Sequence, residues 1–84
     1  MKISVIGVGA MGGSLVEGLL KSVFNAVDIT VADPYQPSLD KFEKMGVSVT
    51  TNNAVAAGKS DVVIVVVKPW LVQGVINEIK DSLN

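Results

Sequence analysis

The pattern of strands and helices in this chain starts from the stretch Ile3-Ser4-Val5-Ile6-Gly7-Val8-Gly9-Ala10-Met11-Gly12. Its first four residues are mostly β-branched, and they predict a short strand that ends at Gly7. Apolar side chains then recur at helical spacing from about residue 10 to residue 22, which predicts a helix with glycines in its first turn. The stretch is therefore expected to form a strand, a tight turn and a helix.

The rest of the chain continues this alternation. Strands are predicted at residues 28–32, 47–50 and 62–67, and helices at 37–45, in a short turn ending at 57, and at 70–83. Asn52 or Asn53 is expected to cap the short turn. Such alternation gives a parallel sheet with right-handed crossovers, so we expect a Rossmann-type α/β fold with helices on both faces and strand order 3-2-1-4. Because these folds commonly have six strands, this one is expected to be incomplete.

Three further details support the assignment. Pro37 suits an early helical position, and Gly46 is placed to cap the C-terminus of the second helix. The run 62–67 is continuous in Val and Ile rather than alternating, as expected for a strand covered by helices on both faces.

The glycine pattern G-x-G-x-x-G follows a predicted strand, opens a helix and lies within a β-α-β unit, which is the context of a dinucleotide-binding loop. Gly7 permits the turn, Gly9 leaves room for a pyrophosphate, and Gly12 lets the helix pack close to the strand. The free N–H groups at the helix N-terminus favour phosphate. Residues 1–84 are therefore expected to form one dinucleotide-binding domain, and the alternative is a purely structural turn. The expected contacts are Gly7, Val8, Gly9, Ala10, Met11 and Gly12.

Asp33 lies at the end of the second predicted strand, where the dinucleotide fingerprint places an acidic residue. Its carboxylate is expected to accept hydrogen bonds from the adenosine ribose and to repel a 2′-phosphate. The chain has no Arg, which is the usual partner of a 2′-phosphate. Both features favour NADH over NADPH. The alternative is that Asp33, followed by Pro34, only forms a turn.

The segment Val66-Val67-Lys68-Pro69 follows at the carboxyl end of the fourth strand. Ligands of open α/β sheets bind beside the carboxyl ends of strands, near the point where the strand order reverses, so this segment is expected near the nicotinamide. A strand terminator with a solvated lysine fits the position equally well. From position alone, Asn53 is favoured as a helix cap over a cofactor contact. Trp70 is expected to be partly buried, and Met11 is expected to fill the core.

Composition excludes several classes of function. A chain of 84 residues allows one domain at most. The net charge of −1 and the lack of a basic run argue against a nucleic-acid partner. Without His or Cys the chain has no disulfide, no thiolate metal site and no Ser–His or Cys–His catalysis, and no metal is expected. No apolar run approaches the roughly 20 residues of a membrane helix, and no signal peptide is expected. The protein is therefore expected to be cytoplasmic and soluble.

The residues Met1 to Gly13 resemble the N-terminus of pyrroline-5-carboxylate reductases. The segment Val66-Val67-Lys68-Pro69 resembles that family's Ala-Val-Lys-Pro stretch, and the segments Lys44-Met45-Gly46-Val47 and Ser60-Asp61-Val62 match at the expected distances. The likeness extends over essentially the whole chain. Many dehydrogenases share the glycine loop, including the 6-phosphogluconate dehydrogenase-like group, whereas the Val-Lys-Pro segment is more specific.

This resemblance implies the NAD(P)H-dependent reduction of the C=N bond of 1-pyrroline-5-carboxylate to L-proline, the last step of proline biosynthesis. It implies that Ile6 to Met11 hold the pyrophosphate, that Asn53 contacts the adenosine side, and that Val66 to Pro69 contact the nicotinamide side. Asp33 departs from members with Ser or an Arg-bearing pair at this strand end, which leaves the choice between NAD and NADP open.

Members of the family continue into a helical C-terminal domain, which mediates dimerisation and supplies most of the substrate site. The parent protein is therefore expected to be a homo-oligomer that acts on a small molecule. The 84-residue chain is expected to bind cofactor without turnover, and its sequence identifies no catalytic residue.

Two other functions remain open at this stage: a non-catalytic NAD-sensing Rossmann module, and another dehydrogenase of the 6-phosphogluconate dehydrogenase-like group. A methyltransferase domain that binds S-adenosylmethionine is less favoured, because such domains commonly have a different glycine spacing and no use for the Val-Lys-Pro segment.

Overall fold

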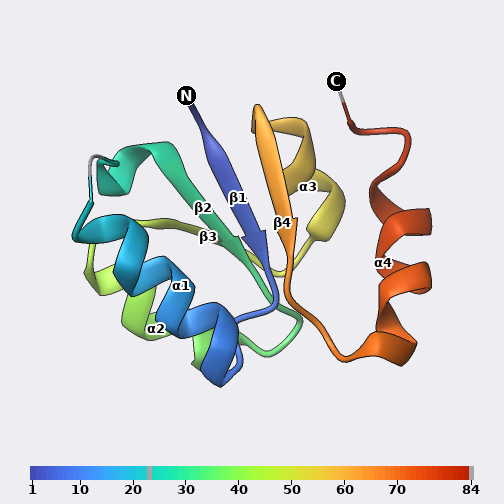
Figure 1. Ribbon diagram of the computed structural model, residues 1–84, viewed down its shortest axis with the longest axis horizontal. Coiled ribbons are helices and arrows are strands. Elements are labelled where there is room, and N and C mark those ends of the chain that lie inside the picture. Colours follow the sequence, from blue (N-terminus) through green and yellow to red (C-terminus); the bar gives the residue numbers. More distant parts are fainter. Residues whose placement is uncertain (23, 84) are drawn as a thin grey trace.

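Four parallel strands form a single sheet at the centre of the molecule (Figure 1). The computed structural model of the chain describes residues 1–22 and 24–83. The strands are β1 (Ile3–Ile6), β2 (Ile29–Ala32), β3 (Ser48–Thr50) and β4 (Val62–Val65). Their order is β3-β2-β1-β4, which confirms the predicted order 3-2-1-4. The strand order therefore reverses between β1 and β4, which are direct neighbours.

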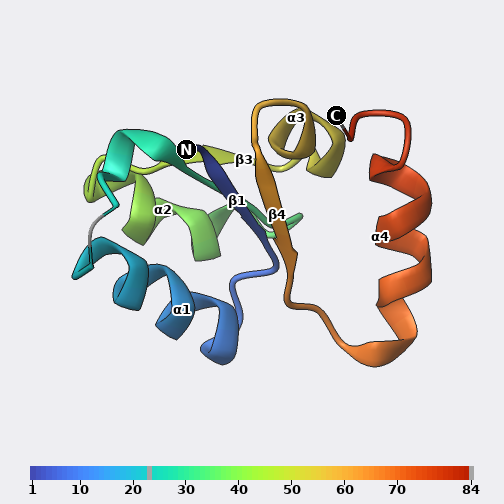
Figure 2. The same cartoon turned by 45° about the horizontal axis from the view of Figure 1, so that its top comes forward.

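Helices cover both faces of this sheet, as predicted. The pair on one side is α1 (Ala10–Leu20) and α2 (Gln36–Lys44), and the pair on the other is α3 (Asn53–Gly58) and α4 (Val72–Ile79) (Figures 1 and 2). Two short 3₁₀ turns, η1 (Ala26–Asp28) and η2 (Pro69–Leu71), precede β2 and α4. The longest helix, α1, has 11 residues, and no helix in the described part of the chain reaches the length and hydropathy of a bilayer span.

The core consists of two apolar clusters, one on each face of the sheet. Val5 faces the α1–α2 side, where it belongs to a cluster with Val16 and Phe42. Its neighbour Ile6 faces the other side and belongs to a cluster with Ala57 and Ile79. Successive residues of a strand point to opposite faces, so β1 is buried from both sides. This double anchoring fixes the end of β1, from which the glycine loop departs.

The edge strand β4 differs from its sequence-based prediction. It ends at Val65, whereas the prediction extended to residue 67, and the helix predicted at 70–83 is the turn η2 followed by α4. Its side chains still pack on both faces as expected, Ile64 against the cluster on the α1–α2 side and Val63 and Val65 against the cluster on the other side, although Val62 is exposed and the others are only partly buried. On its outer side β4 has no neighbouring strand among the described residues. A continuous apolar run therefore marked an edge strand here.

The helix boundaries agree well with the local sequence signals. Pro37 lies in the first turn of α2, and Gly46, with φ of +90°, follows the end of that helix. Of the two asparagines, Asn52 is the cap of α3: its side-chain oxygen accepts hydrogen bonds from the N–H groups of Ala54 at 2.9 Å and Val55 at 3.2 Å. The preference for Asn53 as a cap was therefore wrong, which leaves its side chain free for another role.

Two large apolar side chains are more exposed than expected. Met11 is 77% exposed and Trp70 is 75% exposed, whereas Met11 was expected in the core and Trp70 was expected to be partly buried. Met11 lies in the first turn of α1 and Trp70 in η2, and both segments extend past the ends of the strands. Neither side chain can therefore reach the two core clusters.

Candidate functional site

The glycine loop between β1 and α1 is shaped by two glycines that tolerate no side chain. At Gly7, with φ of +96°, a Cβ atom would collide with the carbonyl oxygen of Val66. At Gly12 a Cβ atom would collide with the carbonyl oxygen of Gly7, so α1 packs directly against the end of β1. Gly9 is different, because a Cβ there would meet nothing within 4 Å. The roles predicted for Gly7 and Gly12 are thus confirmed, and Gly9 faces open space.

The carboxylate of Asp33 ties this loop to the end of β2. Its Oδ2 accepts a hydrogen bond from the N–H of Val8 at 3.0 Å, and its Oδ1 accepts one from the N–H of Tyr35 at 2.9 Å. The second bond spans two residues and is typical of an Asp that forms a turn. Each carboxylate oxygen has a further lone pair. Turn formation is therefore confirmed, and the side chain keeps acceptor capacity towards a ligand.

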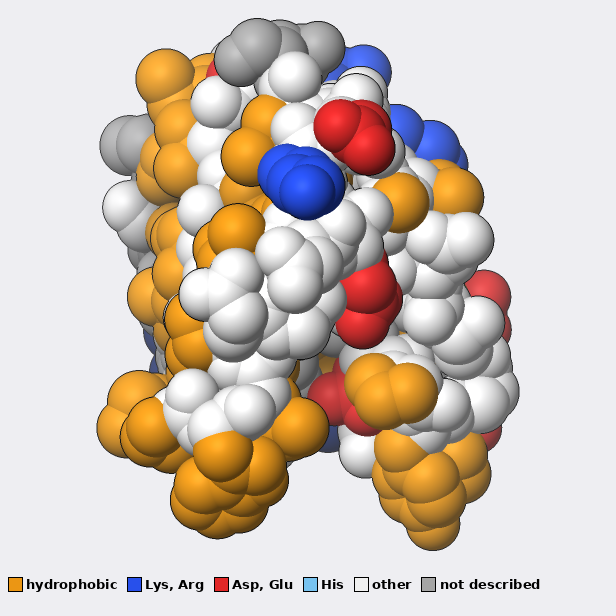
Figure 3. Space-filling model, turned by 90° about the vertical axis from the view of Figure 1, so that its right-hand side faces the viewer, with side chains coloured by type: hydrophobic (Ala, Val, Ile, Leu, Met, Phe, Trp, Pro, Cys, Tyr) orange, Lys and Arg blue, Asp and Glu red, His pale blue; other side chains and the backbone are white. Residues whose placement is uncertain are grey.

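A cleft of about 720 Å³ lies at the carboxyl ends of the strands. It is bordered by the glycine loop, the end of β2, the start of α3 and the connection from β4 to α4. Figure 3 views the α4 side of the molecule, and its lower end shows two groups of hydrophobic side chains separated by a hollow. The residues of the sequence-based prediction that line the cleft are Ile6, Gly7, Gly9, Met11, Gly12, Asp33, Asn53, Val66, Val67, Lys68 and Pro69.

Two residues of the predicted site do not line this cleft. The side chain of Val8 is 7% exposed and belongs to the core cluster on the α1–α2 face, while its N–H is bonded to Asp33. Ala10 is the first residue of α1, and its side chain lies outside the described part of the structure. The loop therefore offers its backbone and its glycines to the cleft rather than all of its side chains.

Asn53 and Glu78 form a hydrogen-bonded pair on the wall of the cleft. The Nδ2 atom of Asn53, at the start of α3, donates to Oε2 of Glu78 on α4 at 3.1 Å. The Oδ1 atom of Asn53 is buried and has no hydrogen-bond partner within the described residues. A buried oxygen without a partner costs about 1–3 kcal/mol. A buried oxygen of this kind, in a residue that lines a cleft, is therefore a candidate acceptor for a hydrogen bond from a ligand.

Several residues on the wall of the cleft were not predicted from the sequence: Pro34, Thr51, Leu71, Val75 and Glu78. Thr51 directly follows β3, so the rule that ligands bind at carboxyl ends of strands would have identified it. Glu78 reaches the cleft only because helix α4 packs beside α3, and Leu71 belongs to the turn η2 that leads into α4. Of the described residues that line the cleft, Lys68 is the only cationic one, and Asp33 and Glu78 are anionic.

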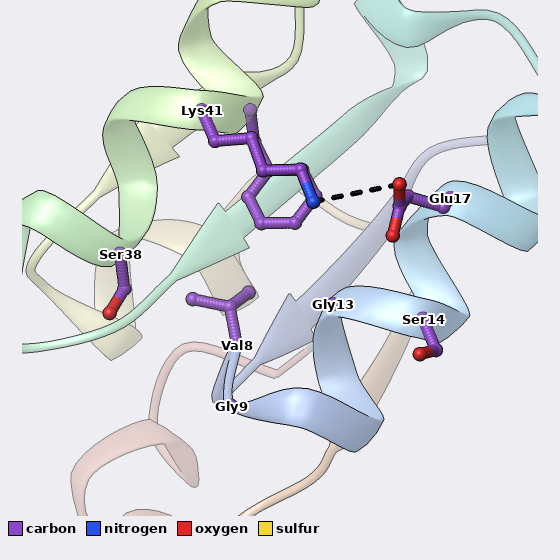
Figure 4. A pocket seen from close by; sticks show the side chains of 8 residues that line it. Val8, Gly9, Gly13, Ser14, Glu17, Ser38 and Lys41 are labelled. Atoms are coloured by element: carbon purple, nitrogen blue, oxygen red, sulfur yellow. Dashed lines mark ion pairs between the residues drawn. The ribbon is translucent and has the colours of Figure 1, made fainter.

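A second hollow, of about 300 Å³, lies between α1 and α2 (Figure 4). The Lys41 side chain extends across it to Glu17, with Nζ 3.5 Å from Oε1, and the same Nζ lies 5.4 Å from the centre of the Phe42 ring. Both charged side chains are substantially exposed, so this ion pair adds about 1 kcal/mol or less to stability. The hollow is therefore bridged by residues that are already paired with each other.

The cleft at the strand ends fits a dinucleotide. Its volume lies within the range of about 300–1,000 Å³ that is typical of ligand sites. The open space beside Gly9 lies at the N-terminus of α1, where free N–H groups favour phosphate. Asn53, whose buried Oδ1 has no hydrogen-bond partner within the described residues, lines the same cleft.

The comparisons with known proteins agree with this geometry. A relative named pyrroline-5-carboxylate reductase, from Methanosarcina acetivorans, is 36% identical over 84 residues, which is 98% of this chain and 31% of that protein. The structure of a pyrroline-5-carboxylate reductase from Coxiella burnetii matches with a TM-score of 0.89 and 37% identity, and it covers 95% of this chain and 30% of that one. The resemblance inferred from the sequence is therefore confirmed.

A more distant structure shows the fold alone. The pyrroline carboxylate reductase of Plasmodium falciparum, solved with NADP bound, matches with a TM-score of 0.84 at 22% identity and covers 98% of this chain and 29% of that one. The chain thus spans less than a third of the length of these relatives. A family profile described as "NADP oxidoreductase coenzyme F420-dependent" matches residues 2–84. Because that match extends over nearly the whole chain, the chain belongs to this oxidoreductase family.

Proposed function

We propose that this chain is the cofactor-binding domain of a pyrroline-5-carboxylate reductase and that it holds NAD(P)H in the cleft at the strand ends. The observation that carries the proposal is the contrast among the loop glycines. Backbone fills the space beside Gly7 and Gly12, whereas the space beside Gly9, which borders both the cleft and the second hollow, is open. A loop that is rigid on both sides of an open glycine is suited to a ligand that approaches the backbone closely.

The cofactor would lie along the carboxyl edge of the sheet. Its pyrophosphate would contact the glycine loop at the N-terminus of α1, its adenosine half would lie between Asp33 and Asn53, and its nicotinamide would lie towards Val66 to Pro69. This direction follows from the strand order, since β2 and β3 are on one side of the loop and β4 is on the other. When bound, the nicotinamide would supply the hydride for the C=N carbon of 1-pyrroline-5-carboxylate.

The reaction requires this domain mainly to hold the cofactor in position. A protonated imine is already electrophilic, so the protein has mainly to orient the cofactor against the substrate. The absence of His and Cys is therefore compatible with the activity. We place the substrate groups and the subunit contacts of the parent enzyme in a helical C-terminal domain, and this chain is expected to bind cofactor without turnover.

The charges on the wall of the cleft favour NADH over NADPH. Asp33 and Glu78 are anionic, and Lys68, the only cationic group among the described lining residues, comes from the segment assigned to the nicotinamide. A 2′-phosphate on the adenosine ribose would meet two carboxylates and no guanidinium. NADH binding is thus expected to be stronger than NADPH binding.

The parent protein is proposed to be a cytoplasmic homo-oligomer that acts on a small molecule, without a nucleic-acid or membrane partner. The net charge of −1 and the absence of any basic run support the lack of a nucleic-acid partner. Sedimentation of the full-length parent at several concentrations measures the oligomeric state, and a monomer at all concentrations would contradict this part of the proposal.

Two measurements test the main proposal. The first is calorimetric titration of the 84-residue chain with NADH, NADPH and S-adenosylmethionine, in which both dinucleotides are expected to bind and S-adenosylmethionine is not. The second is an assay of the full-length parent for reduction of 1-pyrroline-5-carboxylate with each cofactor. Absence of dinucleotide binding would refute the cofactor site. Binding without turnover in the parent would refute the reductase and leave a nucleotide-binding module.

A further inference from the structure

The pair formed by Asn53 and Glu78 connects two helices that are distant in the sequence. Asn53 begins α3 and Glu78 lies near the end of α4, 25 positions later, yet both line the proposed cofactor cleft. The two helices pack against each other through buried residues such as Ala57 and Ile79. Helix packing thus brings the exposed side chain of Glu78 beside Asn53.

The carboxylate determines which way the Asn53 amide points. An amide group has a donor end and an acceptor end, which can exchange places by rotation, whereas a carboxylate only accepts. With Nδ2 of Asn53 3.1 Å from Oε2 of Glu78, the amino end must face the carboxylate. Rotation would place the amide oxygen against the carboxylate oxygen, which is repulsive. Glu78 therefore fixes the direction of the Asn53 carbonyl oxygen as well.

That carbonyl oxygen is the atom without a hydrogen-bond partner within the described residues. Buried polar atoms in folded proteins are nearly always hydrogen-bonded, so an exception within a residue that lines a cleft points to a ligand donor. The neighbouring side chains limit what the ligand offers there, because Asp33 and Glu78 also present acceptors. A pyrophosphate has only acceptors, whereas the adenosine half of a dinucleotide has ribose hydroxyls and an amino group.

We infer that Glu78 is a positioning residue for cofactor binding: it holds the Asn53 amide so that Oδ1 accepts a hydrogen bond from the adenosine half of the dinucleotide. This inference rests on the proposed cofactor cleft. In this scheme Glu78 makes no hydrogen bond to NADH, which has no 2′-phosphate, and acts on NADH binding only through Asn53.

The test compares variants of the 84-residue chain by calorimetric titration with NADH, with ADP-ribose, which is the dinucleotide without its nicotinamide, and with nicotinamide mononucleotide, which lacks the adenosine half. Glu78→Ala is expected to weaken NADH and ADP-ribose by the same factor, about fivefold to tenfold, as for the loss of one hydrogen bond. Its affinity for nicotinamide mononucleotide is expected to be unchanged. Glu78→Gln is expected to fall between the wild type and Glu78→Ala, because the Gln amide can accept from Asn53 Nδ2 in one orientation and donate to Asn53 Oδ1 in the other.

A double-variant cycle separates positioning from other roles. If Glu78 acts through Asn53, then Glu78→Ala in the Asn53→Ala background changes the ADP-ribose affinity no further. Glu43→Ala is the matched control, because it removes an exposed carboxylate from α2 that does not line the cleft. Thermal unfolding of each variant verifies that it is folded.

The possible results are distinct. If the wild type binds neither NADH nor ADP-ribose, the proposed function fails, and this inference fails with it. If the wild type binds and Glu78→Ala has no effect, or has the same effect with and without Asn53, the positioning role is refuted while the cofactor site stands.

Discussion

Replacing Gly9 with alanine adds one methyl group at the point where the glycine loop faces the cleft. The backbone permits this change, because Gly9 has φ of −64° and ψ of −167°, which alanine adopts readily. The new Cβ atom would meet no protein atom within 4 Å. The free chain is therefore expected to fold as before, and the methyl group would occupy space assigned to the cofactor pyrophosphate.

The expected size of the effect follows from what the methyl group displaces. A phosphate oxygen at the N-terminus of α1 accepts hydrogen bonds from backbone N–H groups, and a hydrogen bond to a charged group contributes about 1.5–3 kcal/mol. Loss of one such contact weakens NADH binding about 10- to 100-fold. Gly9 is also the N-cap of α1. Alanine is a poorer N-cap than glycine, so a loss of up to about 1 kcal/mol in the free energy of unfolding is expected.

The assay measures binding and stability for the same samples. NADH affinity is determined by calorimetry, and the free energy of unfolding by urea titration. Gly18→Ala is the matched control, since a Cβ there also meets nothing within 4 Å, but Gly18 lies inside α1 and does not line the cleft. It is expected to leave NADH affinity unchanged and to raise stability by about 0.5–1 kcal/mol.

The reasoning would be refuted if Gly9→Ala bound NADH as tightly as the wild type. It would also be refuted if Gly18→Ala lost as much affinity as Gly9→Ala, because the effect would then come from the helix rather than from contact with the cofactor.

Three further predictions concern the loop, the second strand and the cap of α3. Gly12→Ala places a Cβ atom against the carbonyl oxygen of Gly7, so it is expected to unfold the chain or to lower its melting temperature by many degrees; a circular dichroism melt like that of the wild type would show that α1 can shift freely. Asp33→Asn removes a negative charge beside the ribose, and the ratio of NADPH affinity to NADH affinity is expected to rise about fivefold to tenfold by calorimetry; an unchanged ratio would argue against this role. Asn52→Ala removes the acceptor for two N–H groups, so it is expected to lower the free energy of unfolding by about 0.5–2 kcal/mol, as measured by urea titration. An equal loss in Asn53→Ala would contradict the assignment of Asn52 as the cap.

Local sequence signals predicted much of the site because the glycine loop is a local structure. Gly12 must lack a side chain because it lies against the backbone of Gly7 at the end of β1, and Gly7 because it lies against the backbone of Val66 after the neighbouring strand β4. The spacing of the glycines in the sequence therefore already indicates the shape of the loop. Asp33 was recognisable for a similar reason: it ends the strand next to β1, at a fixed distance along the chain. The segment from Val66 to Pro69 follows the other neighbour of β1, and it does line the cleft.

Other features depended on packing between elements that are distant in the sequence. Both asparagines suited a helix N-terminus, and only the backbone geometry at residue 52 showed which one caps α3. The exposure of Met11 and Trp70 could not be predicted from helical periodicity, because it depends on how far each segment extends past the sheet. The apolar run of β4 suggested burial, but a strand at the edge of the sheet keeps one side open.

The sequence by itself determined the strand order, the glycine loop and the family resemblance, because these follow from short-range patterns and from the handedness of β-α-β crossovers. The tertiary structure alone decided that Glu78 meets Asn53 on the wall of the cleft and that the Asn53 carbonyl oxygen has no partner among the described residues. The physical reason is that the contact forms across the interface of α3 and α4. Its geometry depends on how deeply the two helices pack, which no local pattern of residues specifies.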